Sequence, residues 1–149
     1  MTTEEKELLL KDLCARLPYG VEVQYKGNRY DLTEMHKDGR TYLGSYNSIY
    51  GDWHCNLEFE DYPKPYLRPM SSMTEEERKN FIKCAGYEVE ESENGRHYDY
   101  YLKDFCGTED APCANADAID WLNEHHFDYR GLINKGLALE APKDIYKEK

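Results

Sequence analysis

Two adjacent histidines, His125 and His126, follow two cysteines, Cys106 and Cys113, and these four residues are the set best suited to metal chemistry. Zinc takes imidazole and thiolate ligands, four at a time in a tetrahedron. Zinc modules usually supply them as close pairs such as C-x2-C, whereas here the cysteines are spaced C-x6-C and the histidines are contiguous. Neighbouring residues on a helix point about 100° apart, so one ion rarely binds both. We therefore expect no metal site, and instead one packed and one exposed histidine.

A second chemical candidate is the adjacent pair His54 and Cys55, in a segment with the pattern of a strand. Successive strand side chains point to opposite faces of the sheet, so these two cannot act on each other. A thiolate–imidazole nucleophile would need one of them to meet a partner from another strand. A half-buried, unreactive cysteine is the more common role, and we expect it here.

Carboxylates are abundant and could hydrolyse glycosides or hold a divalent metal if two of them converged. Here they alternate with apolar residues, which is typical of the solvent face of a sheet. The sequence contains no recognised metal-binding, phosphate-binding or nucleophile motif. We therefore predict no catalytic residue and no cofactor, and a small Cys/His- or metal-dependent hydrolase remains the alternative. The carboxylates concerned are Glu58, Glu60, Asp61, Glu88, Glu90, Glu91 and Asp99.

Aromatic residues are the other candidates for function, because 14 tyrosines and 2 tryptophans are present. Tyrosine-rich surface loses little entropy on binding and is typical of protein-binding patches. The same rings can instead complete a thin core with their hydroxyls in water, and the two roles look alike in sequence. The predicted protein-binding residues are Trp53, Tyr62, Tyr66, Tyr98 and Tyr100.

The net charge of −11, from 30 acidic and 19 basic residues, argues against direct nucleic-acid binding, which depends on clustered Lys and Arg. The acidity either keeps the protein in solution or serves as a decoy for a nucleic-acid-binding surface on another protein. No apolar run is long enough to cross a membrane, and the first residues lack the features of a signal peptide. Five scattered cysteines fit reduced thiols, so we expect a cytoplasmic protein.

Helix signals are clear at three places. Thr2 with Glu5, and Thr74 with Glu77, each form the pattern of a capping box, which predicts helices over 3–16 and from residue 74 to about Cys84. Asp117 is predicted to cap a third helix that runs to about His126. A shorter helical turn is expected over 129–135.

Strand signals occur in the sequence between these predicted helices. Four alternating runs, separated by Gly27-Asn28, Asp38-Gly39 and Gly51-Asp52, predict an antiparallel meander over 21–25, 29–36, 40–46 and 53–60. A further hairpin is predicted over 87–91 and 96–102, followed by a loop over 104–117. Residues 61–72 hold three prolines, so we expect an ordered crossing segment that is neither a regular helix nor a central strand.

These elements predict an α+β fold. The expected architecture is an antiparallel sheet of about four to six strands with three main helices packed on it, at least one of them across its face. The chain length fits one domain covering 1–149, with a disordered tail from about residue 143.

Two segments, KPYLRPMSSMTEEE (64–77) and AIDWLNEHHFDYRGLINKGLALEAP (118–142), resemble segments of small uncharacterised proteins of gut-dwelling anaerobic bacteria and their phages or prophages. The resemblance implies action inside an infected or lysogenic bacterium. It brings no activity, cofactor or catalytic residue with it.

We therefore predict a non-enzymatic accessory protein, encoded by a phage or prophage, that binds a host protein. A specific version is an acidic inhibitor of a defence or nucleic-acid enzyme. A structural or assembly protein is a further alternative, and the oligomeric state is left open.

Overall fold

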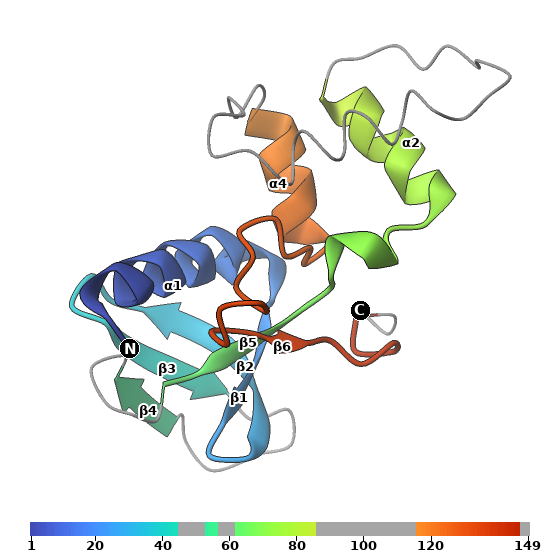
Figure 1. Cartoon of the computed structure of the whole chain (residues 1–149). Helices are drawn as coiled ribbons and strands as arrows, with labels where there is room; N and C mark the ends of the chain where they lie inside the picture. Colours follow the sequence, from blue (N-terminus) through green and yellow to red (C-terminus); the bar gives the residue numbers. More distant parts are fainter. Residues whose placement is uncertain (45–52, 57–61, 86–115, 147–149) are drawn as a thin grey trace, which may run out of the picture.

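The computed structural model describes residues 1–44, 53–56, 62–85 and 116–146, with backbone alone for 53–56. It confirms the α+β arrangement: a mostly antiparallel sheet with helix α1 across one face (Figure 1). The predicted hairpin over 87–91 and 96–102 lies outside the described residues. Within the described part, no helix combines the length and apolarity needed to cross a bilayer.

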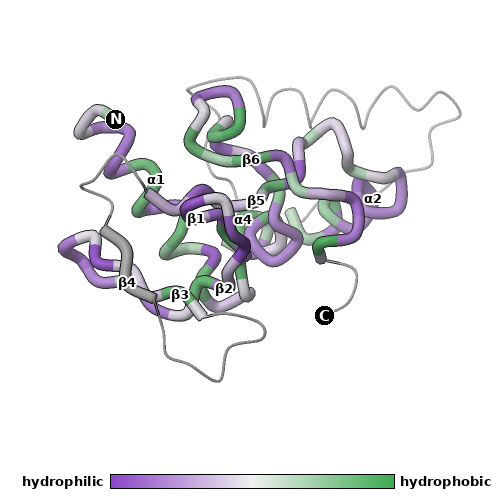
Figure 2. Tube along the Cα trace, turned by 90° about the horizontal axis from the view of Figure 1, so that it is seen from below, coloured by the Kyte–Doolittle hydropathy of each residue, from purple (hydrophilic) through white to green (hydrophobic). Residues whose placement is uncertain are grey.

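Helix α1 (Thr3–Arg16) begins where the capping box predicts. The backbone N–H of Glu5 donates to Thr2 Oγ1 at 3.2 Å, and the N–H of Thr2 donates to Glu5 Oε2 at 2.7 Å. Leu9 and Leu13 on this helix are fully buried against the sheet. Hydrophilic and hydrophobic residues alternate along α1 in Figure 2, as expected of a helix with one buried side.

The predicted meander is present as four antiparallel strands: β1 (Glu22–Tyr25), β2 (Asn28–Met35), β3 (Arg40–Gly44) and β4 (Trp53–Asn56). The full order across the sheet is β4-β3-β2-β1-β5-β6. Buried Val21, Val23, Leu32 and Leu43 meet Leu9 and Leu13 of α1 in the first of three hydrophobic clusters. This cluster fixes the face of the sheet on which α1 lies.

The β1–β2 turn differs by one residue from the predicted Gly27-Asn28. Asn28 pairs with Tyr25, so the turn consists of Lys26 and Gly27. Both have positive φ, 49° and 80°, as a two-residue hairpin turn requires. The asparagine is therefore the first strand residue and not part of the turn.

The proline-rich segment was predicted not to contain a central strand, and this was wrong. It contains β5 (Lys64–Leu67), which lies between β1 and β6 (Leu139–Glu140). Pro65 is tolerated because the two-residue β6 pairs in parallel with Tyr66 and Leu67 and has no residue in register with Pro65. After β5, the 3-10 helix η2 (Met70–Ser72) leads to α2.

Helices α2 (Glu75–Cys84) and α4 (Ala116–Glu124) pack against each other at one end of the sheet (Figure 1). Phe81 of α2 and Trp121 of α4 meet with ring centroids 5.7 Å apart in a second hydrophobic cluster. Asp117 lies in the first turn of α4, not at its cap, because the helix begins earlier than predicted.

The segment after α4 also differs from its prediction. The helical turn expected over 129–135 is a series of turns, in which the Lys135 N–H donates to the Gly131 carbonyl at 3.3 Å without a continuing helix. Asp128 holds these turns in place, since its Oδ1 accepts from the Leu132 N–H and its Oδ2 from the Ile133 N–H. Leu132, Leu137 and Ala138 then join Leu67 in a third cluster beneath β5 and β6.

The disordered tail predicted from about residue 143 does not hold for residues 143–146. Ile145 is 6% exposed, and its backbone N–H donates to the Pro142 carbonyl at 3.1 Å. The Tyr146 hydroxyl makes two further hydrogen bonds, described below. Long-range contacts to the sheet, which local sequence does not reveal, order this segment.

Candidate functional site

The exposed side of α4 carries three carboxylates and no basic residue. Asp117, Asp120 and Glu124 are exposed and spaced three and four residues apart, which places them in one row along the helix. The opposite side buries Ala118, Trp121 and Leu122. The helix is held by its apolar side, and the acidic row faces outward.

A tyrosine that follows the C-terminal end of α1 lies within electrostatic range of this row. Tyr19 belongs to the 3-10 helix η1 (Leu17–Tyr19) and is half-buried. Burial, and then the negative charges of Asp120 and Glu124, raise the pKa of Tyr19. The structure thus places a phenol hydroxyl within electrostatic range of two carboxylates.

The acidic row ends at a sharply defined helix terminus. The backbone N–H of Phe127 donates to the Leu122 carbonyl at 2.9 Å, and that of His126 donates to the Asn123 carbonyl at 3.1 Å. These two bonds form a Schellman motif, in which the residue after the cap is left-handed. His126 takes this position with φ 56°, where glycine is usual.

The adjacent histidines lie in different aromatic surroundings. His125 stacks on Trp121 with ring centroids 3.9 Å apart, and its Nδ1 lies 2.9 Å from the Trp121 carbonyl. His126 is 4% exposed and stacks on Tyr146 with centroids 3.7 Å apart. Both rings are packed, so the expectation that one would be exposed was wrong, because the left-handed turn carries His126 inward.

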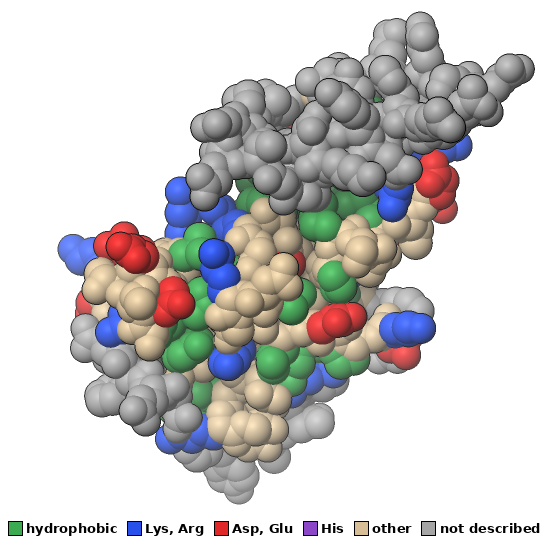
Figure 3. All heavy atoms as spheres, in the orientation of Figure 1, with side chains coloured by type: hydrophobic (Ala, Val, Ile, Leu, Met, Phe, Trp, Pro, Cys, Tyr) green, Lys and Arg blue, Asp and Glu red, His purple; other side chains and the backbone are tan. Residues whose placement is uncertain are grey.

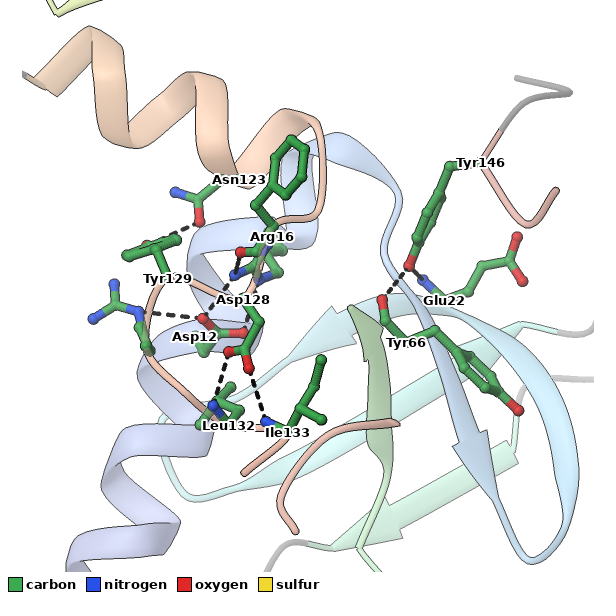
Figure 4. Close-up of polar contacts among 12 residues, drawn as sticks. Asp12, Arg16, Glu22, Tyr66, Asn123, Asp128, Tyr129, Leu132, Ile133 and Tyr146 are labelled. Atoms are coloured by element: carbon green, nitrogen blue, oxygen red, sulfur yellow. Dashed lines mark hydrogen bonds and ion pairs between the residues drawn. The ribbon is translucent and has the colours of Figure 1, made fainter. Parts of the chain in front are cut away.

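A buried ion network joins this turn to α1. Asp12 and Arg16 are fully buried, with Arg16 Nε 2.8 Å from Asp12 Oδ2. Arg16 Nη2 also donates to the Phe127 carbonyl at 2.8 Å, and Arg130 Nε lies 3.2 Å from Asp12 Oδ1 (Figure 4). Because Asp12 and Arg16 have no access to solvent, we assign them a structural role.

Aromatic and backbone contacts complete the network. The Tyr129 hydroxyl donates to Asn123 Oδ1 at 3.0 Å, and the guanidinium groups of Arg16 and Arg130 lie 5.5 and 4.8 Å from the Tyr129 ring centroid. Burial raises the pKa of Tyr129. These contacts hold the end of α4, and with it the acidic row, at a fixed place relative to α1.

A further ion pair joins β5 to α2. Arg68 donates to both carboxylate oxygens of Glu77, at 2.8 and 3.0 Å, and its guanidinium lies 4.2 Å from the Phe127 ring centroid. Burial opposes ionisation of Glu77, but the bonds from Arg68 and Thr74 outweigh it and lower its pKa to about 2. Helices α1 and α2, which both contact α4, are therefore both connected to the turn at Phe127.

The predicted aromatic residues do not form an exposed patch in the described part of the chain. Tyr62 is half-buried against two of the hydrophobic clusters, and the half-buried Tyr66 accepts a hydrogen bond from Gln24 at its hydroxyl. Met1 alone is an exposed large hydrophobic residue there. Tyr62 and Tyr66 therefore complete the core and do not form a binding patch. Only the backbone of Trp53 is described, and Tyr98 and Tyr100 lie outside the described residues.

The candidate metal ligands are not brought together where the structure describes them. Cys106 and Cys113 lie outside the described residues, and His125 and His126 face different rings. Over the described ranges, no group of three or more His, Cys, Asp or Glu side chains is placed to hold a metal ion. The backbones of His54 and Cys55 pair with Tyr42 and Thr41 across the sheet, and this pairing assigns neither a catalytic partner.

Comparison of this chain with protein families, with curated proteins and with solved structures finds no match. The function of the candidate site is therefore inferred from its geometry.

One part of the site has a signal in the sequence itself. Asp12 and Arg16 are four residues apart, on the same face of α1 as Leu9 and Leu13. An oppositely charged pair on an apolar face indicates a buried ion pair. The proximity of Tyr19 to α4 had no such signal, because the two are about a hundred residues apart.

Proposed function

We propose that this protein is a non-enzymatic, phage- or prophage-encoded binding protein that contacts a basic surface of a host protein through the acidic row of α4. The observation that carries the proposal is the row itself: Asp117, Asp120 and Glu124 are exposed on a helix without basic residues. A row of carboxylates matches a surface rich in Lys and Arg.

The rigidity of the row supports this function. Trp121 and Leu122 are buried, a Schellman motif ends the helix, and the ion network of Asp12 and Arg16 holds the following turn. A helix backbone that is held in place before binding loses less entropy when a partner arrives, although the exposed carboxylate side chains still have to be ordered. By contrast, acidic and basic side chains are interspersed on the face shown in Figure 3.

The overall charge supports it as well. A net charge of −11 attracts basic partners over distance and accelerates encounter with them in a salt-dependent way. Host enzymes that act on nucleic acid present basic surfaces of this kind, so we propose inhibition of such an enzyme by occupation of that surface.

The test is capture of host proteins from a lysate of an anaerobic gut bacterium, at low and at high salt. The variant Asp120→Asn/Glu124→Gln removes two charges from the row. The matched control, Glu75→Gln/Glu76→Gln, removes two exposed charges from α2 instead. We expect a nucleic-acid-binding host protein to be captured at low salt by the wild type and the control but not by the α4 variant. Equal capture by both variants would count against the proposal.

A further inference from the structure

The last described residues of the chain, 141–146, return to the sheet and fasten to it at three points. The Ala141 N–H donates to the Leu67 carbonyl at 2.7 Å, Ile145 is buried, and the Tyr146 hydroxyl donates to the Tyr66 carbonyl at 2.7 Å. The same hydroxyl accepts from the Glu22 N–H at 3.4 Å. We infer that residues 141–146 form a C-terminal clasp, which opens and closes as one unit while the rest of the fold stays intact.

The hydroxyl of Tyr146 occupies a gap in the strand ladder. Strands β1 and β5 pair at Gln24 with Lys64 and at Val23 with Pro65, and the same register would next bring Glu22 opposite Tyr66. That pair is not formed. The Glu22 N–H and the Tyr66 carbonyl are bridged instead by the Tyr146 hydroxyl, which Figure 4 shows pointing between them. The clasp thus completes the sheet where two strands separate.

The ring of Tyr146 connects the clasp to α4. It stacks on His126, the left-handed residue of the Schellman motif, and burial raises the pKa of Tyr146. One side chain therefore touches β1, β5 and the end of α4. Opening of the clasp would free the backbone groups of Glu22 and Tyr66 and one face of His126.

The size of the clasp explains why it can open alone. It has one buried apolar side chain and few backbone bonds, whereas the sheet beneath it buries Val21, Val23, Leu32 and Leu43 together. Segments with few buried contacts open at free energies below that of global unfolding. Opening of the clasp is a property of the isolated protein and does not rest on the proposed function.

Native-state hydrogen exchange of the full chain, followed by NMR, tests this. In the wild type we expect the amides of Glu22, Ala141 and Ile145 to share one opening free energy, lower than that of Leu32 in the centre of the sheet. The variant Tyr146→Phe keeps the ring and removes the hydroxyl. In it, these three amides should exchange roughly five- to tenfold faster. The exchange rate of the Leu32 amide should change only by the loss of global stability.

Tyr129→Phe is the matched control, because it also replaces a hydrogen-bonded tyrosine by phenylalanine, but its hydroxyl bonds to Asn123, away from the clasp. It should leave the three clasp amides at their wild-type rates relative to Leu32. The inference is overturned if the three amides open with unrelated free energies. It is overturned equally if they exchange only through global unfolding, or if both tyrosine variants accelerate them alike.

Discussion

The imidazole of His126 stacks on the phenol ring of Tyr146, with ring centroids 3.7 Å apart and planes inclined by 18°. His126 pays a conformational cost in this position, since its φ of 56° is left-handed. The stack and the burial of the His126 ring offset that cost. The turn after α4 therefore keeps a histidine where most helices of this type have glycine.

Replacement of His126 by glycine and by alanine separates these two effects. Both variants lose the stack, but only His126→Ala keeps the left-handed strain, so we expect His126→Gly to be more stable by about 1 kcal/mol. Urea unfolding followed by circular dichroism measures the difference. At Asn80, an exposed position inside α2, alanine should be the more stable residue. If glycine and alanine had the same order of stability at positions 126 and 80, the assigned backbone strain at His126 would be contradicted.

Removal of one member of the buried ion pair should be strongly destabilising. Asp12→Ala leaves Arg16 charged and fully buried, so we expect a loss of about 3–5 kcal/mol in the free energy of unfolding. The control is Arg40→Ala, which breaks the solvent-exposed pair with Asp38 but keeps the bond from the backbone N–H of residue 40 to Asp38, and should leave the urea midpoint nearly unchanged. A midpoint for Asp12→Ala equal to that of the control would show that the buried pair does not hold the fold.

Acid should weaken the junction between β5 and α2 through Glu77. The pKa of Glu77 is lowered from 4.5 to about 2 in the folded protein. Its contribution is therefore complete above pH 4.5 and is lost as the pH falls from 4.5 towards 2. The pair with Arg68 is only partly buried, so we expect this contribution to be on the order of 1 kcal/mol.

The variant Glu77→Gln checks this prediction, because it cannot titrate. Unfolding curves of the wild type and the variant, measured between neutral pH and pH 2, should converge as the pH falls. Glu76→Gln, the exposed neighbour, should follow the wild type throughout. Parallel curves for Glu77→Gln and the wild type would refute the assigned shift.

A methyl group at Gly44 should not fit. A Cβ there would lie 2.8 Å from Thr33 Cγ2, and Thr33 is the extra residue of the bulge between β2 and β3. The hydroxyl of Thr33 donates to the Tyr42 carbonyl at 3.1 Å, which holds its side chain in place. We expect Gly44→Ala to cost about 0.5–1.5 kcal/mol, the cost of forcing the Thr33 side chain off its preferred rotamer.

Thr33→Ser supplies the second half of that experiment. It deletes the clashing methyl and keeps the hydroxyl, so in the Gly44→Ala background it should restore part of the lost stability. A double-mutant cycle from urea unfolding measures the coupling between the two sites. Strict additivity of the two changes would mean that Thr33 is not the obstacle.

Local sequence was enough to predict the elements whose signals lie within a few residues. The capping boxes of Thr2 with Glu5 and of Thr74 with Glu77 place the starts of α1 and α2, and both are present. Alternating runs separated by turn residues predict the meander of β1 to β4, and with it the α+β class. These signals suffice because a cap or a hairpin turn satisfies its own backbone groups locally.

The tertiary structure decided everything that depends on residues far apart in the chain. Pro65 lies in an interior strand because β6 has no residue in register with it. Arg16 is bound to a carbonyl 111 positions away, and Tyr146 bonds to a strand 124 positions away. His126 and Tyr62 turn inward because other segments cover them. Such contacts leave no periodic pattern in the sequence, since their partners are chosen by packing and not by spacing along the chain.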